Sequence, residues 1–219
     1  MISFYMKLEK NFFSKLEDIQ NDSVDKIVDS RLNGDLQPDM QFQYHVATIS
    51  NENLMDAIRH AMPNSKQGIF VDPCCGDGSS LILAKKAGYD VFGIDIQNAL
   101  VNIAKENIDV AMSKSLIPIN GIVNVKQGDM FNMNSYESVG VSFNRVDVFY
   151  LYSMPRHTNK FFKQFVDYAK HGAKIISVPG MDFASVDRLY NDLDVHGNLT
   201  TDYQDRENLT FLTFKKSLF

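Results

Sequence analysis

The segment VDPCCGDGSS, residues 71–80, is the feature that most constrains the fold of this chain. It places two glycines in a short polar turn between an apolar stretch at 68–71 and a stretch of helical periodicity at 79–86. Glycine has no Cβ, so such a turn lets a ligand approach exposed backbone N–H groups closely. In open α/β sheets, ligands collect at the carboxyl ends of the strands. The segment therefore predicts a strand, a ligand-binding turn and a helix.

After Pro63, short apolar stretches alternate with stretches of helical periodicity. This alternation predicts βαβ units and a parallel sheet covered by helices. The expected elements are strands at 68–71, 91–94, 122–125, 146–152 and 173–178, with helices at 79–86, 98–112 and 159–170.

The end of the chain departs from this alternation. A helix is expected at 185–191, followed by strands at 194–200 and 209–215. A polar loop, residues 202–206, is expected to join the two strands. Strands that follow each other across a short polar loop predict an antiparallel hairpin.

Helices are expected before the alternation begins. Apolar residues recur at helical spacing between residues 12 and 28, and Asn33-Gly34 provides a stop. A second helix is expected between a capping serine, Ser50, and Pro63. We therefore expect an N-terminal helical extension or lid at 1–49 and a ligand-binding domain at 50–219. An oligomer contact is the alternative use of the first helix.

A carboxylate, Asp95, ends the second expected strand, where it can accept both hydroxyls of a ribose. The series Asp72-x-x-x-Gly76-x-Gly78 followed by Asp95 resembles the first two motifs of class I S-adenosylmethionine-dependent methyltransferases. The resemblance implies a three-layer, Rossmann-like α/β sandwich. Its sheet would be mostly parallel and seven-stranded, with a C-terminal antiparallel hairpin. It also implies S-adenosylmethionine as the cofactor.

The resemblance implies roles for individual residues. The Gly76 and Gly78 backbone would pass close to the methionine moiety, and Asp72 would organise that end of the pocket. Asp95 would hold the ribose, with Ile96 beside it in the cofactor site.

Cys74 stands where the usual motif has its first glycine. The form Asp72-Pro73-x-Cys75-Gly76 is similar to a subset of these enzymes that methylates exocyclic amino groups in nucleic acids. Cys74 therefore remains among the expected cofactor-binding residues.

A third motif position follows the third expected strand. In similar proteins an acid here binds the adenine amino group and the next residue covers the ring, and Asp129 and Met130 are the matching residues. A carboxylate accepts hydrogen bonds from an exocyclic amine, and a thioether provides a polarizable apolar surface.

The fourth motif position bears on the acceptor of the methyl group. Amino-methyltransferases acting on bases usually show Asn/Asp-Pro-Pro-aromatic here, whereas this chain has Ser153-Met154-Pro155-Arg156. Residues 150–155 and 174–179 are instead similar to small class I enzymes that modify protein side chains or small molecules. A protein or small-molecule acceptor is therefore favoured, with a nucleic-acid base as the alternative.

Methyl transfer is an in-line displacement that needs alignment of a nucleophile and exclusion of water more than catalytic side chains. An amine acceptor must also lose a proton. Tyr152 and His157 are the candidate catalytic residues, and Tyr150 is expected in the cofactor pocket. Tyr150 and Tyr152 also fit a purely structural role, packed on one face of the sheet.

Composition narrows the alternatives. The 219 residues carry a formal net charge of −5, which gives no broad attraction for nucleic acid. Adjacent Cys74 and Cys75 suit neither a disulfide framework nor a zinc site, so no metal is expected. No apolar run reaches the length of a signal peptide core or a membrane span, which favours a cytoplasmic protein without a membrane partner.

Two rival functions share the early motifs. A nicotinamide-dependent oxidoreductase also has a glycine turn and an acid after the second strand, but the G-x-G-x-x-G spacing is absent, because Cys74 replaces a glycine. A non-catalytic module that keeps the cofactor pocket is the other alternative. The sequence sets neither the oligomeric state nor the identity of the acceptor.

Overall fold

A computed structural model of the chain describes residues 2–36, 50–62, 67–152, 155–177, 199–204 and 212–216. In chain order the elements are α1 (Ile2–Leu32), α2 (Asn51–Ala61), β1 (Ile69–Asp72), α3 (Ser79–Ala87), β2 (Asp90–Asp95), α4 (Asn98–Ser113), β3 (Val123–Gln127), α5 (Met133–Val139), the 3₁₀ helix η1 (Phe143–Arg145), β4 (Val148–Leu151), α6 (Pro155–Tyr168), β5 (Lys174–Ser177), β6 (Leu199–Gln204) and β7 (Leu212–Lys216).

The strands form one sheet in the order β3-β2-β1-β4-β5-β7-β6. The pairs from β3 through β5 are all parallel, whereas β7 runs antiparallel to both β5 and β6. The chain builds β1, β2 and β3 outward in one direction and then places β4 on the other side of β1. Strand order thus reverses between β1 and β4, which is where ligand sites form in such sheets. The expected α/β fold with a parallel sheet is confirmed.

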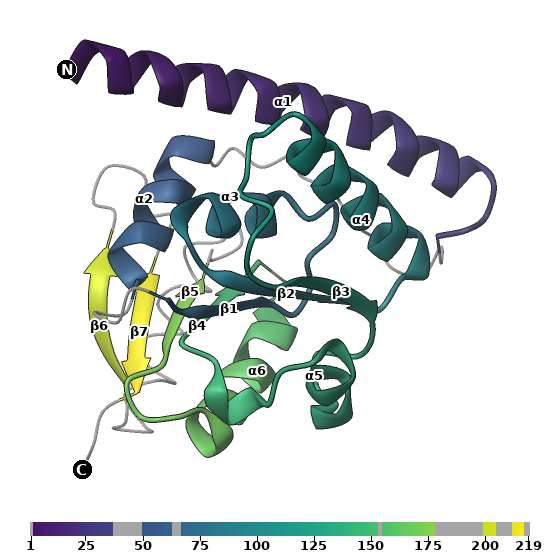
Figure 1. Cartoon of the computed structure of the whole chain (residues 1–219). Helices are drawn as coiled ribbons and strands as arrows, with labels where there is room; N and C mark the ends of the chain where they lie inside the picture. Colours follow the sequence, from purple (N-terminus) through teal and green to yellow (C-terminus); the bar gives the residue numbers. More distant parts are fainter. Residues whose placement is uncertain are drawn as a thin grey trace.

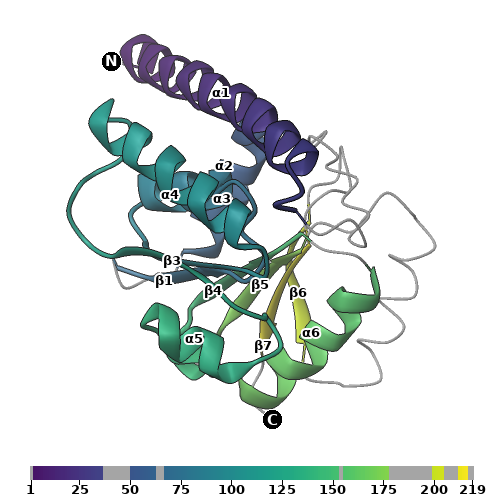
Figure 2. The same ribbon diagram turned by 90° about the vertical axis from the view of Figure 1, so that its right-hand side faces the viewer.

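Helices cover both faces of the sheet (Figure 1). The α2, α3 and α4 helices lie on one face and α5 and α6 on the other, as the rotated view in Figure 2 also shows. All four residues of β4 are buried, and they alternate between the two faces. Val148 and Tyr150 join the core on the α2–α3 side, while Phe149 and Leu151 join the core on the α5–α6 side. Burial on both faces explains why β4 is apolar throughout.

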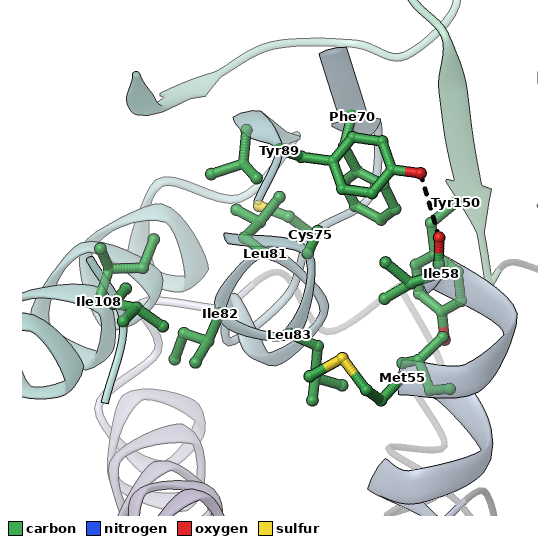
Figure 3. Packing of buried hydrophobic residues seen from close by; sticks show 14 of the residues in the cluster. Met55, Ile58, Phe70, Cys75, Leu81, Ile82, Leu83, Tyr89, Ile108 and Tyr150 are labelled. Carbon is green, nitrogen blue, oxygen red and sulfur yellow. Dashed lines mark hydrogen bonds between the residues drawn. The ribbon is translucent and has the colours of Figure 1, made fainter. Parts of the chain in front are cut away.

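The first core cluster lies between the sheet and helices α1 to α4 (Figure 3). Tyr89 is completely buried there, and its hydroxyl donates a hydrogen bond of 3.0 Å to the carbonyl of Ile58 on α2. The ring of Tyr150 stacks against Phe70 of β1, with the ring centroids 6.5 Å apart. The buried tyrosine hydroxyl of Tyr89 thereby fixes α2 to the turn before β2.

The second core cluster lies on the opposite face and is largely aromatic. Phe143 contacts the rings of both Tyr136 and Phe149, at centroid distances of 4.9 and 4.6 Å. Tilted and edge-on ring pairs of this kind add to the free energy gained by burial. This cluster holds α5 and α6 against β4 and β5.

The long helix α1 lies across the outer side of α2, α3 and α4 (Figures 1 and 2). Its apolar stripe is buried at Phe12, Phe13, Leu16 and Ile19 within the first core cluster. Nearer its end, Ile27 packs with Leu100 and Ile103 of α4. The predicted amphipathic helix is confirmed, and Gly34 follows its end with a positive φ of +80°.

Several predicted boundaries are wrong. Helix α5 was not expected, and α6 begins at Pro155 rather than at residue 159. Strand β6 occupies Leu199–Gln204, so part of the expected 202–206 loop is strand. The helix expected at 185–191 lies outside the described residues. Among the described segments, none of the helices combines the length and apolar character needed to cross a lipid bilayer.

Candidate cofactor and active site

The site is organised around residues 73–78, here called the glycine loop, which joins β1 to α3. Gly76 and Gly78 both adopt positive φ values, +52° and +80°. A Cβ at Gly78 would also lie 3.0 Å from the Cβ and 3.2 Å from the Cα of Ala104 on α4. Gly78 is therefore required both by its backbone conformation and by the close approach of α4.

The glycine loop is hydrogen-bonded to the carboxyl end of β2. The N–H of Cys75 donates to the carbonyl of Ile94 at 2.9 Å, and the N–H of Gly76 donates to Oδ2 of Asp95 at 3.0 Å. The other carboxylate oxygen of Asp95 accepts from the N–H of Gln97 at 2.9 Å. The structure thus brings the first two predicted motifs into direct contact through one buried side chain.

Asp72, the last residue of β1, is 2% exposed. Burial raises the pKa of its carboxyl to about 7. Hydrogen bonds from the Ser80 hydroxyl and the Cys74 N–H oppose this pKa shift, and the nearby carboxylates of Asp95 and Asp77 add to it. A pKa near 7 implies that both protonation states of Asp72 are populated near neutral pH, and a neighbouring cation would favour the ionised form.

Acidic side chains dominate the surroundings of the glycine loop. Burial raises the pKa of Asp77 and of Asp95 as well, although backbone N–H groups donate to both. The lysines of α3, Lys85 and Lys86, lie in its last turn, at the end away from the loop. This arrangement attracts a cationic group and repels a phosphate.

The third motif position lies next to the second. The N–H of Gly128 donates to the carbonyl of Asp95 at 2.9 Å, which joins the end of β3 to the end of β2. Asp129 follows with an exposed side chain, and one of its carboxylate oxygens accepts from the N–H of Phe131 at 2.9 Å. The carboxylate of Asp129 keeps further acceptor positions for a ligand.

Met130 and Ile96 border the same strand ends. Met130 is partly buried against the second core cluster, and its carbonyl accepts from the Tyr136 hydroxyl at 2.7 Å. Ile96 is 51% exposed, immediately after β2. An exposed isoleucine side chain beside a carboxylate can pack against the apolar face of a ligand ring.

The end of β4 closes the site on the other side of β1. The Cys74 thiol donates to the carbonyl of Tyr152 at 3.3 Å. Burial raises the pKa of the Cys74 thiol well above its usual range, so Cys74 acts as a donor and not as a nucleophile. This contact holds the glycine loop beside the residues that follow β4.

The two candidate tyrosines belong to the first core cluster. Tyr150 is buried between Phe70 and α2 (Figure 3), and burial followed by the charge of Asp72 raises the pKa of its hydroxyl. Tyr152 packs at the edge of the same cluster, and burial raises its pKa too. Both hydroxyls are therefore neutral at physiological pH.

His157 lies in a different place, at the start of α6. Its ring meets the ring of Phe131 edge-on, with the centroids 5.9 Å apart. The ammonium of Lys160 lies 3.9 Å from the centroid of the same Phe131 ring. Neither Phe131 nor Lys160 was predicted from the sequence, although an aromatic residue directly after Asp129-Met130 was a usable signal. Among the residues that the structure describes, no group of histidine, cysteine and acidic side chains is arranged to hold a metal ion.

The close approach at Gly78 predicts an unusually large effect of a Gly78→Ala substitution. Gly34 shares the φ of +80° but has nothing within 4 Å of the position that a Cβ would take, so Gly34→Ala measures the conformational cost alone. We expect a loss of about 1 kcal/mol for Gly34→Ala and about 2–4 kcal/mol for Gly78→Ala in the free energy of unfolding by urea. Equal losses would show that Ala104 does not restrict the loop.

The raised pKa of Asp72 predicts a pH-dependent loss of stability. Because the pKa is about 7 in the folded protein against 3.8 as the ordinary value, protonated Asp72 stabilises the fold at low pH. That contribution is lost as the pH rises through 7. We expect Asp72→Asn to lack this loss, so that wild type weakens relative to the variant by on the order of 3 kcal/mol between pH 4.5 and 7.5.

The control is Asp109→Asn, which removes an exposed carboxylate of α4 and should keep the wild-type pH dependence. Urea denaturation of all three proteins at both pH values decides the matter. Parallel pH profiles for wild type and Asp72→Asn would contradict the assignment of the pKa shift to Asp72.

Comparison with known proteins connects this geometry to an enzyme class. The model of the family described as D12 class N6 adenine-specific DNA methyltransferase matches residues 50–120, a segment from α2 to the loop after α4. No curated protein matches the chain in sequence.

Solved structures share the fold at low sequence identity. An O-methyltransferase from Bacillus cereus in complex with SAH has a TM-score of 0.58 and 12% identity, with 94% of this chain and 91% of that chain covered. The ribosomal protein L11 methylase from Lactobacillus delbrueckii subsp. bulgaricus has a TM-score of 0.56 and 18% identity, with coverages of 77% and 79%. An RNA methyltransferase from Salinibacter ruber in complex with S-adenosyl-L-homocysteine has a TM-score of 0.53 and 20% identity, with coverages of 76% and 92%.

The local family match and the shared fold agree with the motif order along the sheet. The parallel sheet reverses its strand order beside the glycine loop, and three motif positions lie at neighbouring strand ends. The chain therefore has the Rossmann-like α/β fold that is also found in S-adenosylmethionine-dependent methyltransferases, and its residues 50–120 resemble a family of adenine-specific DNA methyltransferases.

Proposed function

We propose that this chain transfers a methyl group from S-adenosylmethionine to a protein amine or to a small molecule. The observation that carries the proposal is the junction at the glycine loop, where the Gly76 N–H binds the carboxylate of Asp95 and the Cys74 thiol binds the carbonyl of Tyr152. One loop thus joins the strand ends on the cofactor side to the end of β4, beyond which an acceptor would bind.

The cofactor would lie along the ends of β1, β2 and β3. Its methionine part would pass the backbone of Gly76 and Gly78, with Asp95 at the ribose. At the adenine, Asp129 would accept from the exocyclic amine, while Ile96 and Met130 would contact the ring. The exposed carboxylate of Asp129 and the half-exposed side chain of Ile96 support this placement. Ile96 follows Asp95 in sequence, and Asp129 follows Gly128, whose N–H donates to the carbonyl of Asp95.

The charge of the site favours this cofactor over a dinucleotide. The α-ammonium and sulfonium groups of S-adenosylmethionine are cationic, and buried Asp72 and Asp95 and partly buried Asp77 lie around the glycine loop. Ionised carboxylates in a buried site are stabilised by a nearby positive charge. A pyrophosphate beside the glycine loop would be repelled by Asp72 and Asp77, which argues against a nicotinamide cofactor.

When bound, S-adenosylmethionine supplies an electrophilic methyl group. The protein's share of the reaction is to align the acceptor and exclude water. The raised pKa values of Tyr150 and Tyr152 keep their hydroxyls neutral, so Tyr152 would orient the acceptor amine through a hydrogen bond. His157, at the rim beside Phe131, would pass the released proton to solvent.

The acceptor preference follows from the end of β4. The family match ends at residue 120 and so does not reach this part of the chain. Tyr152 is followed by Ser153-Met154-Pro155, a segment without the acid or amide that binds the amine of a base in base-specific amino-methyltransferases. The solved structures with this fold include enzymes named for RNA, for a ribosomal protein and for O-methylation, so the fold is compatible with several acceptors.

A nucleic-acid base is the second candidate acceptor. Two observations favour it: the D12 match over residues 50–120, which hold the first two motifs, and the ring of Phe131 with the ammonium of Lys160 above it. An aromatic ring beside a cation is a common arrangement for stacking a base next to a phosphate.

We extend the proposal to the organisation of the whole chain. Strands β7 and β6 would complete the seven-stranded sheet of class I enzymes. Residues 1–49 would form a helical extension to a catalytic domain at 50–219, in a protein of the cytoplasm.

Placing Asp95 and Asp129 on the cofactor predicts the effect of two substitutions. Asp95→Asn keeps the shape of the side chain but loses a charged acceptor, so the affinity for S-adenosylhomocysteine should fall at least about tenfold. Asp129→Asn, on an exposed side chain, should lower it by about three- to tenfold without affecting the fold. Isothermal titration calorimetry measures both, with circular dichroism to verify folding.

Asp109→Asn again serves as the matched control, since it removes an acid from α4 away from the strand ends. It should bind S-adenosylhomocysteine as tightly as wild type does. Wild-type affinity in folded Asp95→Asn and Asp129→Asn would refute the proposed placement of the ribose and the adenine.

Methyl-labelled S-adenosylmethionine distinguishes the acceptors. We expect label to enter a protein fraction or a mixture of small amines, and not adenine- or cytosine-containing DNA or RNA oligonucleotides. Transfer confined to the oligonucleotides would replace our acceptor with the nucleic-acid base.

Once the acceptor is identified, Tyr152→Phe should lower the rate of methyl transfer to it by about tenfold while leaving cofactor affinity unchanged.

A further inference from the structure

A buried polar contact joins α1 to α4. Ser23 of α1 is completely buried, and Asn107 of α4 is 2% exposed. The side-chain amide of Asn107 donates to the hydroxyl of Ser23 at 2.7 Å, and that hydroxyl donates to the carbonyl of Ile19 at 2.7 Å. Buried polar groups are costly unless paired, so this contact fixes one position of α1 on α4.

The same amide reaches the cofactor site. Asn107 Nδ2 also donates to the carbonyl of Asp77 at 2.8 Å, in the middle of the glycine loop. The two hydrogens of one amide group thus bind Ser23 on one side and the loop on the other. The loop's other described hydrogen bonds outside its own segment involve β1, β2, α3 and the end of β4, so this bond is its hydrogen-bonded link, through Asn107, to the N-terminal helix.

Several contacts hold α1 in place around this point. Gln20 exchanges two hydrogen bonds with Asn51 of α2, at 3.1 and 2.9 Å. Lys26 pairs with Glu106 of α4 at 2.9 Å, and Ile27 packs against α4. Because these contacts lie on both sides of Ser23 and are independent of one another, the loss of any single one leaves the serine in place.

We propose that α1 positions the glycine loop, with Ser23 fixing the amide of Asn107 and Asn107 fixing the carbonyl of Asp77. Ser23 and Asn107 are positioning residues, because they act on the cofactor only through the loop. The Asp77 carbonyl lies between Gly76 and Gly78, whose positive φ values set the course of the backbone. The inference rests on the proposed cofactor site and gives the N-terminal helix a function in it beyond packing.

Substitutions along this path should loosen the loop and weaken cofactor binding. Asn107→Asp keeps the shape but replaces the donating amide with oxygen, so the affinity for S-adenosylhomocysteine should fall at least about tenfold. Ser23→Ala leaves the amide of Asn107 without its second partner and should lower the affinity by about three- to tenfold. The double variant should bind S-adenosylhomocysteine no more weakly than Asn107→Asp alone, because both changes act through the hydrogen bond from Asn107 to the Asp77 carbonyl.

Two controls separate positioning from general destabilisation. Lys26→Ala removes the neighbouring ion pair between α1 and α4 and should leave the affinity within about twofold of wild type. Ile27→Ala should lower the thermal midpoint through lost packing, again with unchanged affinity in the folded protein. Amide hydrogen exchange of peptides covering residues 73–80 should accelerate in Ser23→Ala and Asn107→Asp, and not in either control.

Wild-type affinity and wild-type exchange in both Ser23→Ala and Asn107→Asp would overturn the inference. So would an equal loss of affinity in Ile27→Ala, since the hydrogen bond would then not be the cause. If the wild-type protein itself fails to bind S-adenosylhomocysteine, the proposed function fails, while the exchange experiment still decides whether α1 positions the loop.

Discussion

The hydrogen bond between the N–H of Gly76 and the carboxylate of Asp95 is the interaction on which the site depends. It joins the glycine loop after β1 to the end of β2. The other oxygen of the same carboxylate accepts from the N–H of Gln97, the residue before α4. The carbonyl of Asp95 then holds Gly128 at the end of β3. One buried residue, Asp95, thus aligns the ends of β1, β2 and β3. Gly76 and Gly78 are needed because glycine adopts the positive φ values that bring the loop within hydrogen-bonding distance of Asp95.

This arrangement places negative charge where burial makes it costly. Burial raises the pKa values of Asp72, Asp77 and Asp95, so the protein without a ligand holds these acids in an unfavourable environment. A ligand carrying ammonium and sulfonium groups relieves that cost. Perturbed pKa values of this kind cluster at functional sites.

The sequence predicted the parts of the molecule that depend on local patterns. The strand, glycine turn and helix around Gly76 were predicted, and so was the carboxylate Asp95 at the end of the next strand. These features depend on the spacing of apolar residues and glycines along the chain, which the sequence shows directly. The predicted end of β6, residue 200, was wrong, because a polar strand gives no clear hydrophobic signal where it ends. The bond between Ser23 and Asn107 could not be predicted, since it joins residues 84 positions apart and depends on how two helices pack.

Titration calorimetry with S-adenosylmethionine, S-adenosylhomocysteine and NAD tests the central claim most directly. The acids beside the glycine loop, Asp72 and Asp77, and the missing G-x-G-x-x-G spacing predict that the wild-type protein binds the first two ligands and not NAD. Binding of NAD without either of the other ligands would contradict the methyltransferase assignment and favour an oxidoreductase. Failure of all three to bind would indicate a chain that keeps the fold but has lost the cofactor site.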